Sequence, residues 1–275
     1  MGPISPGETV KHLGEDRAIF AEWMRTLNRG EASSETPGRL VLRIGAFFVG
    51  IPYKPGTLET KKVERLVLNL KELDCVTFVE NVVALAWLGK SGRKSFDAFR
   101  RLLRKIRYRQ GLLRDYASRL HYFSDWIHDN ERKGVVKDVT EEIGGRPFHK
   151  AINFMTTHPE LYPPLTQAIE CRRMRSVERT ISRRKLFFIP KKDLNRKERR
   201  INDGDLIAIT AKTEGLDILH VGFAARVKGR IHLFHASSAE GGVVLSSKRL
   251  YRYLMENEAR SGIMVARLSG RGPRI

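Results

Sequence analysis

The C-terminal third of the chain carries a series of strand-like segments, and this series constrains the fold more than any other feature. Glycine-containing turns separate the apolar runs, as in consecutive antiparallel strands. The expected strands lie at 205–210, 218–227, 230–235, 243–245 and 262–268, with a helix at 248–256. The preceding part of the chain has helical spacing instead. Helices first and an antiparallel meander afterwards predict an α+β fold.

Apolar residues earlier in the chain recur at helical spacing, and the strongest run covers 75–88. Asp74 is a suitable N-cap for that helix. Other helices are expected at 16–27, 40–49, 95–108 and 165–184, with a break at 50–56 and a short strand at 66–70.

Neither an internal repeat nor a Pro/Ser-rich linker divides the chain. We expect residues 1–39 to form an N-terminal helical extension. Residues 40–270 are expected to form a single domain with a helical insertion around 93–200.

The net charge of +20 is concentrated in two segments. Residues 93–109 have a surplus of seven basic side chains, and residues 172–200 have a surplus of ten. Such patches attract polyanions, and nucleic acid, an anionic cell-wall polymer and a lipid surface all fit. Apolar residues nevertheless keep helical spacing within 95–108, which favours an amphipathic surface helix over a dedicated nucleic-acid-binding element.

Composition excludes several other classes of protein. A hydrophobic fraction of 41% is ordinary for a globular chain and argues against disorder. No apolar run is long enough for a membrane-spanning helix, and the first residues show no pattern of a secretory signal. Two cysteines, Cys75 and Cys171, cannot form a disulfide framework.

Cys75 is the first candidate for catalytic chemistry, because it follows the capping Asp74 directly. A thiol in the first turn of a helix feels the positive end of the helix dipole, which favours the thiolate. Backbone N–H groups at the same place could hold a developing oxyanion. The alternative is a packed and chemically inert cysteine.

Two histidines could complete such a site. His220 begins one expected strand and His235 ends the next, so the turn at 228–229 could bring the two imidazoles together. A nucleophilic cysteine needs a base, and the base needs an orienting partner. His232 is an odd number of residues from His235, so we expect it on the opposite face.

These motifs occur in the order seen in the NlpC-like family of bacterial cell-wall cysteine hydrolases, which the sequence resembles. The shared motifs are Asp74-Cys75, Gly204-Asp205-Leu206, His220-Val221-Gly222 and His235-Ala236. The resemblance implies a papain-like fold, with N-terminal helices, the nucleophile helix among them, packed on a C-terminal antiparallel sheet. Tyr53 is similar to a family tyrosine near the nucleophile, and with the Cys75 N–H it would stabilise the oxyanion. Thr57 and Val76-Thr77 depart from the common pattern.

The residues that stand at these positions point to one branch of this family, the N-acetylmuramoyl-L-alanine amidase-like proteins, which the sequence resembles. Similar segments run in order from about residue 40 to 268, and they include 73–81, 118–127, 153–155, 188–191, 215–223 and 234–238. The resemblance implies hydrolysis of the amide between N-acetylmuramic acid and L-Ala, with no cofactor. The expected binding partners are peptidoglycan or muropeptides. We expect the protein to be a monomer. The family resemblance implies the cell envelope.

The middle segment offers substrate-binding candidates. His121, Tyr122, Asp125 and Trp126 combine aromatic faces with an acid and an imidazole, which suits sugar stacking and hydrogen bonding. The alternative is that Tyr122 and Trp126 pack into the core at i, i+4 spacing.

Weaker candidates lie on either side of that segment. Asn153 and His158 belong to this group. Arg107, Tyr108 and Arg109 could meet a stem-peptide carboxylate or form a solvated helix face.

Two other functions remain open from the residues alone. A zinc-dependent amidase could draw on His220, His232, His235 and Asp217, although His232 and His235 are expected to point apart. The basic charge would also suit a nucleic-acid-binding protein, although none of its usual signatures is present.

Overall fold

A computed structural model describes residues 8–10, 13–28, 35–59, 63–92 and 95–269. The helices are α1 (Leu13–Asn28), α2 (Pro37–Ala46), α3 (Cys75–Lys90), α4 (Phe96–Arg107), α5 (Phe123–Arg132), α6 (Thr140–Ile143), α7 (Phe154–Thr157), α8 (Ala168–Ser182), α9 (Leu194–Lys197) and α10 (Leu250–Met255). The strands are β1 (Glu8–Val10), β2 (Leu66–Leu68), β3 (Val136–Asp138), β4 (Arg146–Pro147), β5 (Phe187–Pro190), β6 (Leu206–Ala211), β7 (Ile218–Val227), β8 (Arg230–Ser237), β9 (Gly242–Arg249) and β10 (Arg260–Leu268).

One antiparallel sheet organises the described chain. Its strands run in the order β4-β5-β10-β6-β7-β8-β9, and β3 also pairs with β10. The hairpin between β7 and β8 turns at Lys228 and Gly229, which both have positive φ, as a tight type I′ turn requires. The expected α+β class is thereby confirmed, and the expected strand at 218–227 coincides with β7.

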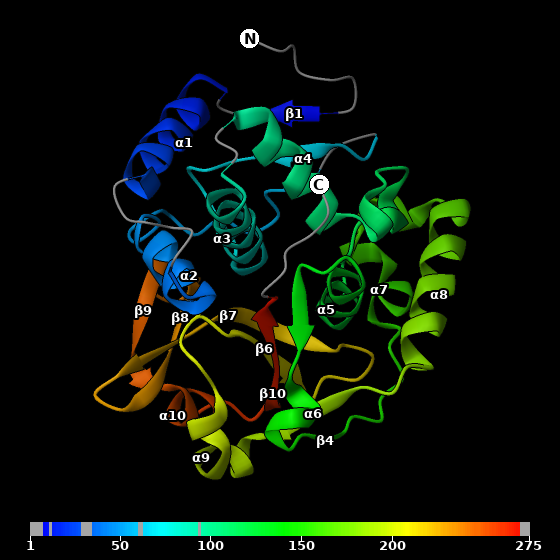
Figure 1. Cartoon of the computed structure of the whole chain (residues 1–275). Helices are drawn as coiled ribbons and strands as arrows, with labels where there is room; N and C mark the ends of the chain where they lie inside the picture. Colours follow the sequence, from blue (N-terminus) through cyan, green and yellow to red (C-terminus); the bar gives the residue numbers. More distant parts are fainter. Residues whose placement is uncertain (1–7, 11–12, 29–34, 60–62, 93–94, 270–275) are drawn as a thin grey trace.

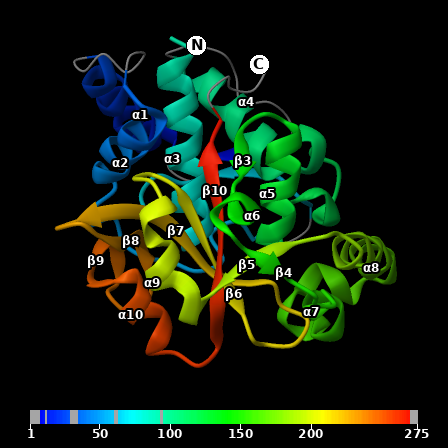
Figure 2. The ribbon, with the colours of Figure 1, turned by 60° about the horizontal axis from the view of Figure 1, so that its bottom comes forward.

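Both faces of this sheet are covered, because alternate residues of its central strands enter two different cores. Along β6, Leu206 and Ala208 pack with α1–α4, whereas Ile207 and Ile209 pack with α9 and α10. Figures 1 and 2 show these two layers, with α1–α4 on one side of the sheet and α9 and α10 on the other. A strand covered on both faces has no polar face, which explains the uninterrupted burial of β6.

The buried helix α3 packs against β7 and β8 and fixes the position of its first residue. Asp74 accepts a hydrogen bond from the Thr77 N–H at 2.8 Å, and the Asp74 N–H donates to the Thr77 hydroxyl at 2.9 Å. This capping box confirms Asp74 as the N-cap. Every residue from Thr77 to Leu88 is buried, as expected for a helix that is apolar all round.

The helices α5, α7 and α8 lie together beside the sheet and α3 (Figure 1). They belong to the expected insertion around 93–200; the division of the chain into that insertion, an extension at 1–39 and a domain at 40–270 stays a prediction. Among the described residues, no helix combines the length and hydrophobicity that a bilayer crossing requires.

The basic helix α4 has the expected amphipathic stripe, but two of its arginines depart from the expectation of a solvated charged face. Arg100 and Arg107 are 4% and 2% exposed. Arg107 donates from Nε to Glu80 of α3 at 2.7 Å. Part of the basic surplus therefore belongs to the interior.

Candidate active site

Cys75 is the first residue of α3 and lines a cavity of about 140 Å³. The lining also includes residues 216–221, which end the loop before β7 and begin that strand, and His220 is among them. The Cys75 side chain is half-buried and free of any disulfide. The cavity therefore brings together the thiol and one of the two expected histidines.

The two imidazoles meet as the hairpin predicted. Nε2 of His220 lies 2.6 Å from Nδ1 of His235, and the rings are nearly perpendicular with centroids 4.8 Å apart. His235 is fully buried. His232 is instead hydrogen-bonded through Nδ1 to the Ser246 carbonyl at 2.9 Å, away from this pair.

Gly222 allows this approach between the strands. A Cβ at Gly222 would lie 2.7 Å from the Phe234 carbonyl oxygen and 2.9 Å from Cβ of His235. Such contacts are too close for any real side chain, and one of the atoms is backbone. The glycine of the His-Val-Gly motif therefore makes room for the strand that carries His235.

Gly222→Ala is expected to destabilise the protein by about 1–3 kcal/mol, because overpacking forces backbone shifts. It should also lower activity, because the shift acts on His235. Denaturant unfolding and turnover assays measure the two effects. Gly14→Ala is the matched control, since a Cβ there meets nothing within 4 Å. Equal stabilities of the two variants would contradict the packing argument.

The electrostatics of the cavity differ from the expectation of a resting thiolate. Burial, followed by the negative charge of Asp74, raises the pKa of the Cys75 thiol to about 12. Backbone N–H groups of Val221, Cys75 and Val76 act in the opposite direction on this pKa. The helix start does favour the thiolate, but the loss of hydration outweighs it.

Both histidines are held neutral. Burial, then the charges of His235 and Arg260, lowers the pKa of His220 to about 3. Burial, then Arg260, lowers the pKa of His235 to about 4. The resting site thus combines a neutral Cys75 thiol with a neutral His220 in the cavity, and His220 contacts a neutral His235 behind it.

Tyr253 and Arg260 lie close to this pair, and the sequence interpretation did not include them. The Tyr253 ring packs edge-on to the His235 ring, with the two ring centroids 5.5 Å apart. The Arg260 guanidinium lies 3.8 Å from the centre of the Tyr253 ring. Burial raises the pKa of Tyr253, and Cys75 contributes in the same direction. No local pattern marks either residue, because α10 and β10 approach the cavity only in the folded chain.

Tyr53 is also within electrostatic reach of the nucleophile candidate. Its N–H donates to the Gly241 carbonyl at 2.9 Å, and it forms a bridge with Leu73, two residues before Cys75. Burial raises the pKa of Tyr53, followed by the charges of Cys75 and Asp74. The half-buried phenol therefore remains protonated and able to donate a hydrogen bond.

Two of the expected substrate-binding residues line the cavity, but both have partners within the protein. His121 is hydrogen-bonded through Nε2 to the Tyr116 carbonyl at 2.8 Å. The Tyr122 hydroxyl donates to Glu178 at 2.7 Å and accepts from the Met155 N–H at 2.9 Å. The cavity wall also includes Met155 and Tyr162, which the sequence interpretation missed.

Asp125 and Trp126 lie in the interior instead. Trp126 is fully buried, and its Nε1 donates to Glu80 at 3.2 Å. The Asp125 carboxylate is enclosed by Arg109 and Arg184. A ring without exposed surface cannot stack on a sugar, so neither residue belongs to the site that we propose below.

The weaker candidates are also outside the cavity. Arg107 and Tyr108 are buried, and the Tyr108 hydroxyl donates to Glu64 at 2.7 Å. The His158 ring stacks on Phe154, and its Nδ1 lies 3.0 Å from the Phe154 carbonyl oxygen. Neither Asn153 nor His158 is among the cavity-lining residues. Arg109 alone of the basic candidates borders a different cavity.

The four residues considered for zinc do not converge. Asp217 is buried, and its carboxylate accepts from the N–H groups of Ser124 and Ile218 at 2.8 and 2.7 Å. Within the part of the chain that the structure describes, no group of three His, Cys, Asp or Glu side chains is arranged to hold a metal ion.

The fold and the site define an α+β protein with a cavity that is lined by a thiol and by one member of a hydrogen-bonded histidine pair. The chain belongs to the N-acetylmuramoyl-L-alanine amidase-like family, whose model matches residues 43–263. No curated protein gives a significant match.

Solved structures agree with this family. The chain is 37% identical to an N-acetylmuramoyl-L-alanine amidase from Bacteroides uniformis, with a TM-score of 0.81 over 85% of this chain and 99% of that chain. It is 40% identical to a Bacteroides fragilis protein provisionally described as a xylanase, with a TM-score of 0.78 over 82% and 100% of the chains. A protein from Legionella pneumophila shares the fold at 22% identity, with a TM-score of 0.69 over 95% and 97%. The family and these neighbours together support a hydrolase.

Proposed function

We propose that this chain is a cysteine amidase that hydrolyses the amide between N-acetylmuramic acid and L-Ala, in peptidoglycan or its fragments. One observation carries the proposal: Cys75 and His220 line the same cavity, and His220 is hydrogen-bonded to His235. The family and the Bacteroides uniformis amidase support the substrate class. A nucleophile helix packed on an antiparallel sheet supports a papain-like fold of the NlpC-like kind.

His220 is the proposed base. When its Nε2–H donates to Nδ1 of His235, its own Nδ1 carries the lone pair that can accept the Sγ proton of Cys75. The low pKa of His220 keeps that lone pair available, and the raised pKa of Cys75 keeps the thiol protonated until substrate arrives. His235 fixes the tautomer and orientation of His220, as an orienting partner does in other nucleophile–base sites.

The reaction then proceeds in two steps. The Cys75 thiolate attacks the lactyl carbonyl carbon, and the oxyanion receives hydrogen bonds from the Cys75 N–H and the Tyr53 hydroxyl. The protonated His220 donates its proton to the nitrogen of L-Ala, the C–N bond breaks, and a thioester remains on Cys75. His220 next deprotonates a water molecule, which attacks the thioester and releases the lactyl carboxylate and the thiol.

Digestion of defined muropeptides followed by mass spectrometry tests this reaction. We expect a muramic acid product with a free lactyl carboxylate and a peptide with a free N-terminal L-Ala. Cleavage within the stem peptide would overturn the assignment of the scissile bond. Cleavage of a glycosidic bond would point to the chemistry suggested by the name of the Bacteroides fragilis protein.

The pH profile should reflect the neutral histidine pair. Activity requires unprotonated His220, so kcat/KM is expected to fall only as the pH drops through its folded-state pKa of about 3, far below the ordinary 6.5. Arg260→Gln removes a cation that lowers the pKa of both histidines, so the acid limb should move toward neutral pH. Arg252→Gln, on the exposed side of α10, is the control. Identical acid limbs in the two variants would contradict this account of the pair.

A chelator distinguishes the thiol mechanism from the zinc alternative. We expect full turnover after treatment with EDTA, because Cys75 and His220 supply the nucleophile and the base. Loss of turnover that added zinc restores would favour the metal-dependent amidase. Magnesium added to the chelated protein serves as the control.

A further inference from the structure

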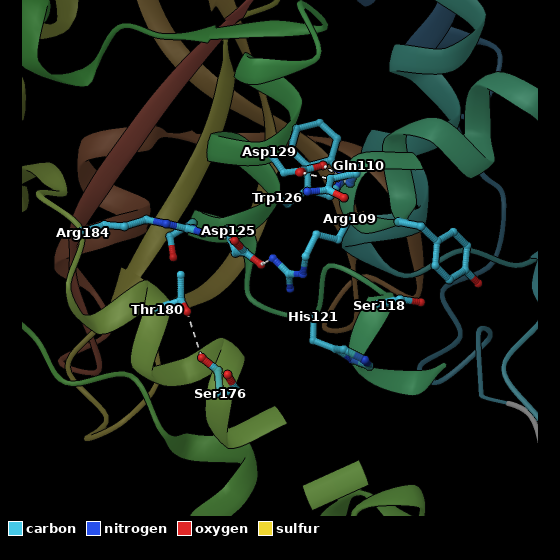
Figure 3. Close-up of polar contacts among 12 residues, drawn as sticks. Arg109, Gln110, Ser118, His121, Asp125, Trp126, Asp129, Ser176, Thr180 and Arg184 are labelled. Carbon is cyan, nitrogen blue, oxygen red and sulfur yellow. Dashed lines mark hydrogen bonds and ion pairs between the residues drawn. The ribbon is translucent and has the colours of Figure 1, made fainter. Parts of the chain in front are cut away.

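A second cavity, of about 430 Å³, lies between α5, α8 and the turn at Arg109–Gly111. Figure 3 shows the side chains around it, with Arg109, Asp125 and Arg184 in line and Ser176 and Thr180 on α8. None of its lining residues lines the Cys75 cavity. Its volume is in the range of sites that hold small molecules.

A buried carboxylate organises the basic groups of this cavity. Asp125 is 1% exposed in its side chain and contacts Arg109 Nη1 at 2.6 Å through one oxygen and Arg184 Nη1 at 2.5 Å through the other. Each arginine uses one nitrogen in this contact, so the fork of each guanidinium keeps further donors. One carboxylate cannot neutralise two guanidiniums, and one positive charge remains.

The turn that carries Arg109 is held in an unusual conformation. Gln110 has φ +55°, in the left-handed region that residues other than glycine rarely adopt. Its N–H faces both oxygens of Asp129 at 3.2 Å, and Asp129 also pairs with Lys133 at 2.5 Å. Strained backbone of this kind persists where the surroundings fix it and is common at ligand sites.

The charge balance of the cavity is positive. Arg109, Arg132, Lys133 and Arg184 line it, against Asp129 on its wall and Asp125 beneath, which leaves a charge of +2. Arg132 is exposed and has no ion-pair partner among the described residues. Burial and then the charge of Arg184 lower the pKa of His128, so this imidazole adds no charge near neutral pH.

We propose that this cavity binds an oxyanion, the carboxylate or phosphate group of a small ligand. Two arginines fixed by one buried acid present planar donors, which suit the paired oxygens of such groups. Ser176 and Thr180 lie on the same wall, where the Thr180 hydroxyl donates to the Ser176 carbonyl oxygen at 2.9 Å. The helix α5 contributes Phe123 to the Cys75 cavity and Asp129 to this one, so the two cavities are neighbours. Either a stem-peptide carboxylate or free phosphate could supply this oxyanion. The stem-peptide alternative rests on the proposed function.

Calorimetric titration of the full-length chain with inorganic phosphate tests the site without any turnover. We expect saturable binding in the millimolar range or tighter, weakened about tenfold or more by Arg184→Gln, since hydrogen bonds to charged groups contribute at that scale. Arg183→Gln changes the adjacent exposed arginine, which does not line the cavity, and should leave binding unchanged. Arg132→Gln is a second test that leaves the contacts of Asp125 intact. Absence of saturable binding, or equal binding by all three variants, would overturn the proposal.

A second arm identifies the source of the oxyanion. N-acetylmuramoyl-L-alanyl-D-glutamate and its D-isoglutamine counterpart differ by one carboxylate, and each is titrated into Cys75→Ala protein to prevent cleavage. Tighter binding of the glutamate form, lost in Cys75→Ala/Arg184→Gln, supports a stem-peptide carboxylate. Phosphate binding without this difference supports a free phosphate and leaves the proposed amidase function unaffected.

Discussion

Cys75→Ala is expected to lower turnover of a muramoyl-L-alanyl peptide by about 10⁴-fold or more, to the level of the residual binding contributions. The reason is that, among the described residues, no other thiol and no serine or threonine hydroxyl lines the cavity that contains His220. The assay is product formation by mass spectrometry under single-turnover conditions. The small Cys75→Ala change lies at the helix start and leaves the capping box of Asp74 and Thr77 in place.

Cys171→Ala is the matched control for this experiment. Cys171 is the other free cysteine, and it lies on α8 with its Sγ near Arg175. Its removal should leave turnover unchanged. If Cys75→Ala kept more than a few per cent of the wild-type rate, the assigned nucleophile would be wrong, whatever the activity of Cys171→Ala.

Glu80→Ala is expected to destabilise the fold by about 3–5 kcal/mol, the cost of leaving a buried charge without its partner. Glu80 lies on α3, just beyond the nucleophile candidate, and both its side chain and that of Arg107 are at most 3% exposed. Glu80 also accepts from Trp126, and burial raises the pKa of its carboxyl against the opposing effect of Arg107. Denaturant unfolding monitored by circular dichroism gives the free energy directly.

The double variant Glu80→Gln/Arg107→Met removes both charges and should recover much of this loss, because the amide still accepts from Trp126. Arg101→Met changes an exposed position of α4, the helix that carries Arg107, and should have little effect on stability. If Glu80→Ala cost no more than Arg101→Met, the buried ion pair would not be what supports α3.

Local pattern was sufficient for the parts of the site that depend on neighbours in the chain. The capping box of α3 needs only Asp74 and Thr77, so the start of the helix and the position of Cys75 could be predicted. The meeting of His220 and His235 depends on one tight turn and the alternation of two paired strands. Both arguments involve short sequence separations and regular geometry.

The environment of these groups could not be predicted in the same way. The helix start favours a thiolate at Cys75, yet burial against the folded cavity wall raises its pKa. Tyr253 and Arg260 reach the histidines from α10 and β10, with no signal in their own segments. The Cys75 thiol loses its hydration through contacts with the whole fold. A sum over local effects therefore gives the wrong direction for the shift of its pKa.

Charge patterns were the least reliable guide to position. Arg107 and Arg184 belong to segments that suggested solvated surfaces, and each instead pairs with a buried acid, Glu80 or Asp125. Asp125 and Trp126 suggested a sugar-binding surface and serve the interior instead. A sequence shows that a side chain is charged or aromatic, but only its distant partners decide whether it can leave water.

The amino-acid sequence by itself determined the α+β order of elements, the capped helix with Cys75 at its first turn, and the hairpin that joins the two histidines. These features follow from hydrophobic periodicity, capping and turn chemistry, which act over a few residues. The tertiary structure decided which polar groups are buried, what their pKa values are, and that Arg109 and Arg184, 75 positions apart in the chain, share one carboxylate. Desolvation and ion pairing depend on the complete surroundings of a group, and those surroundings exist only in the folded molecule.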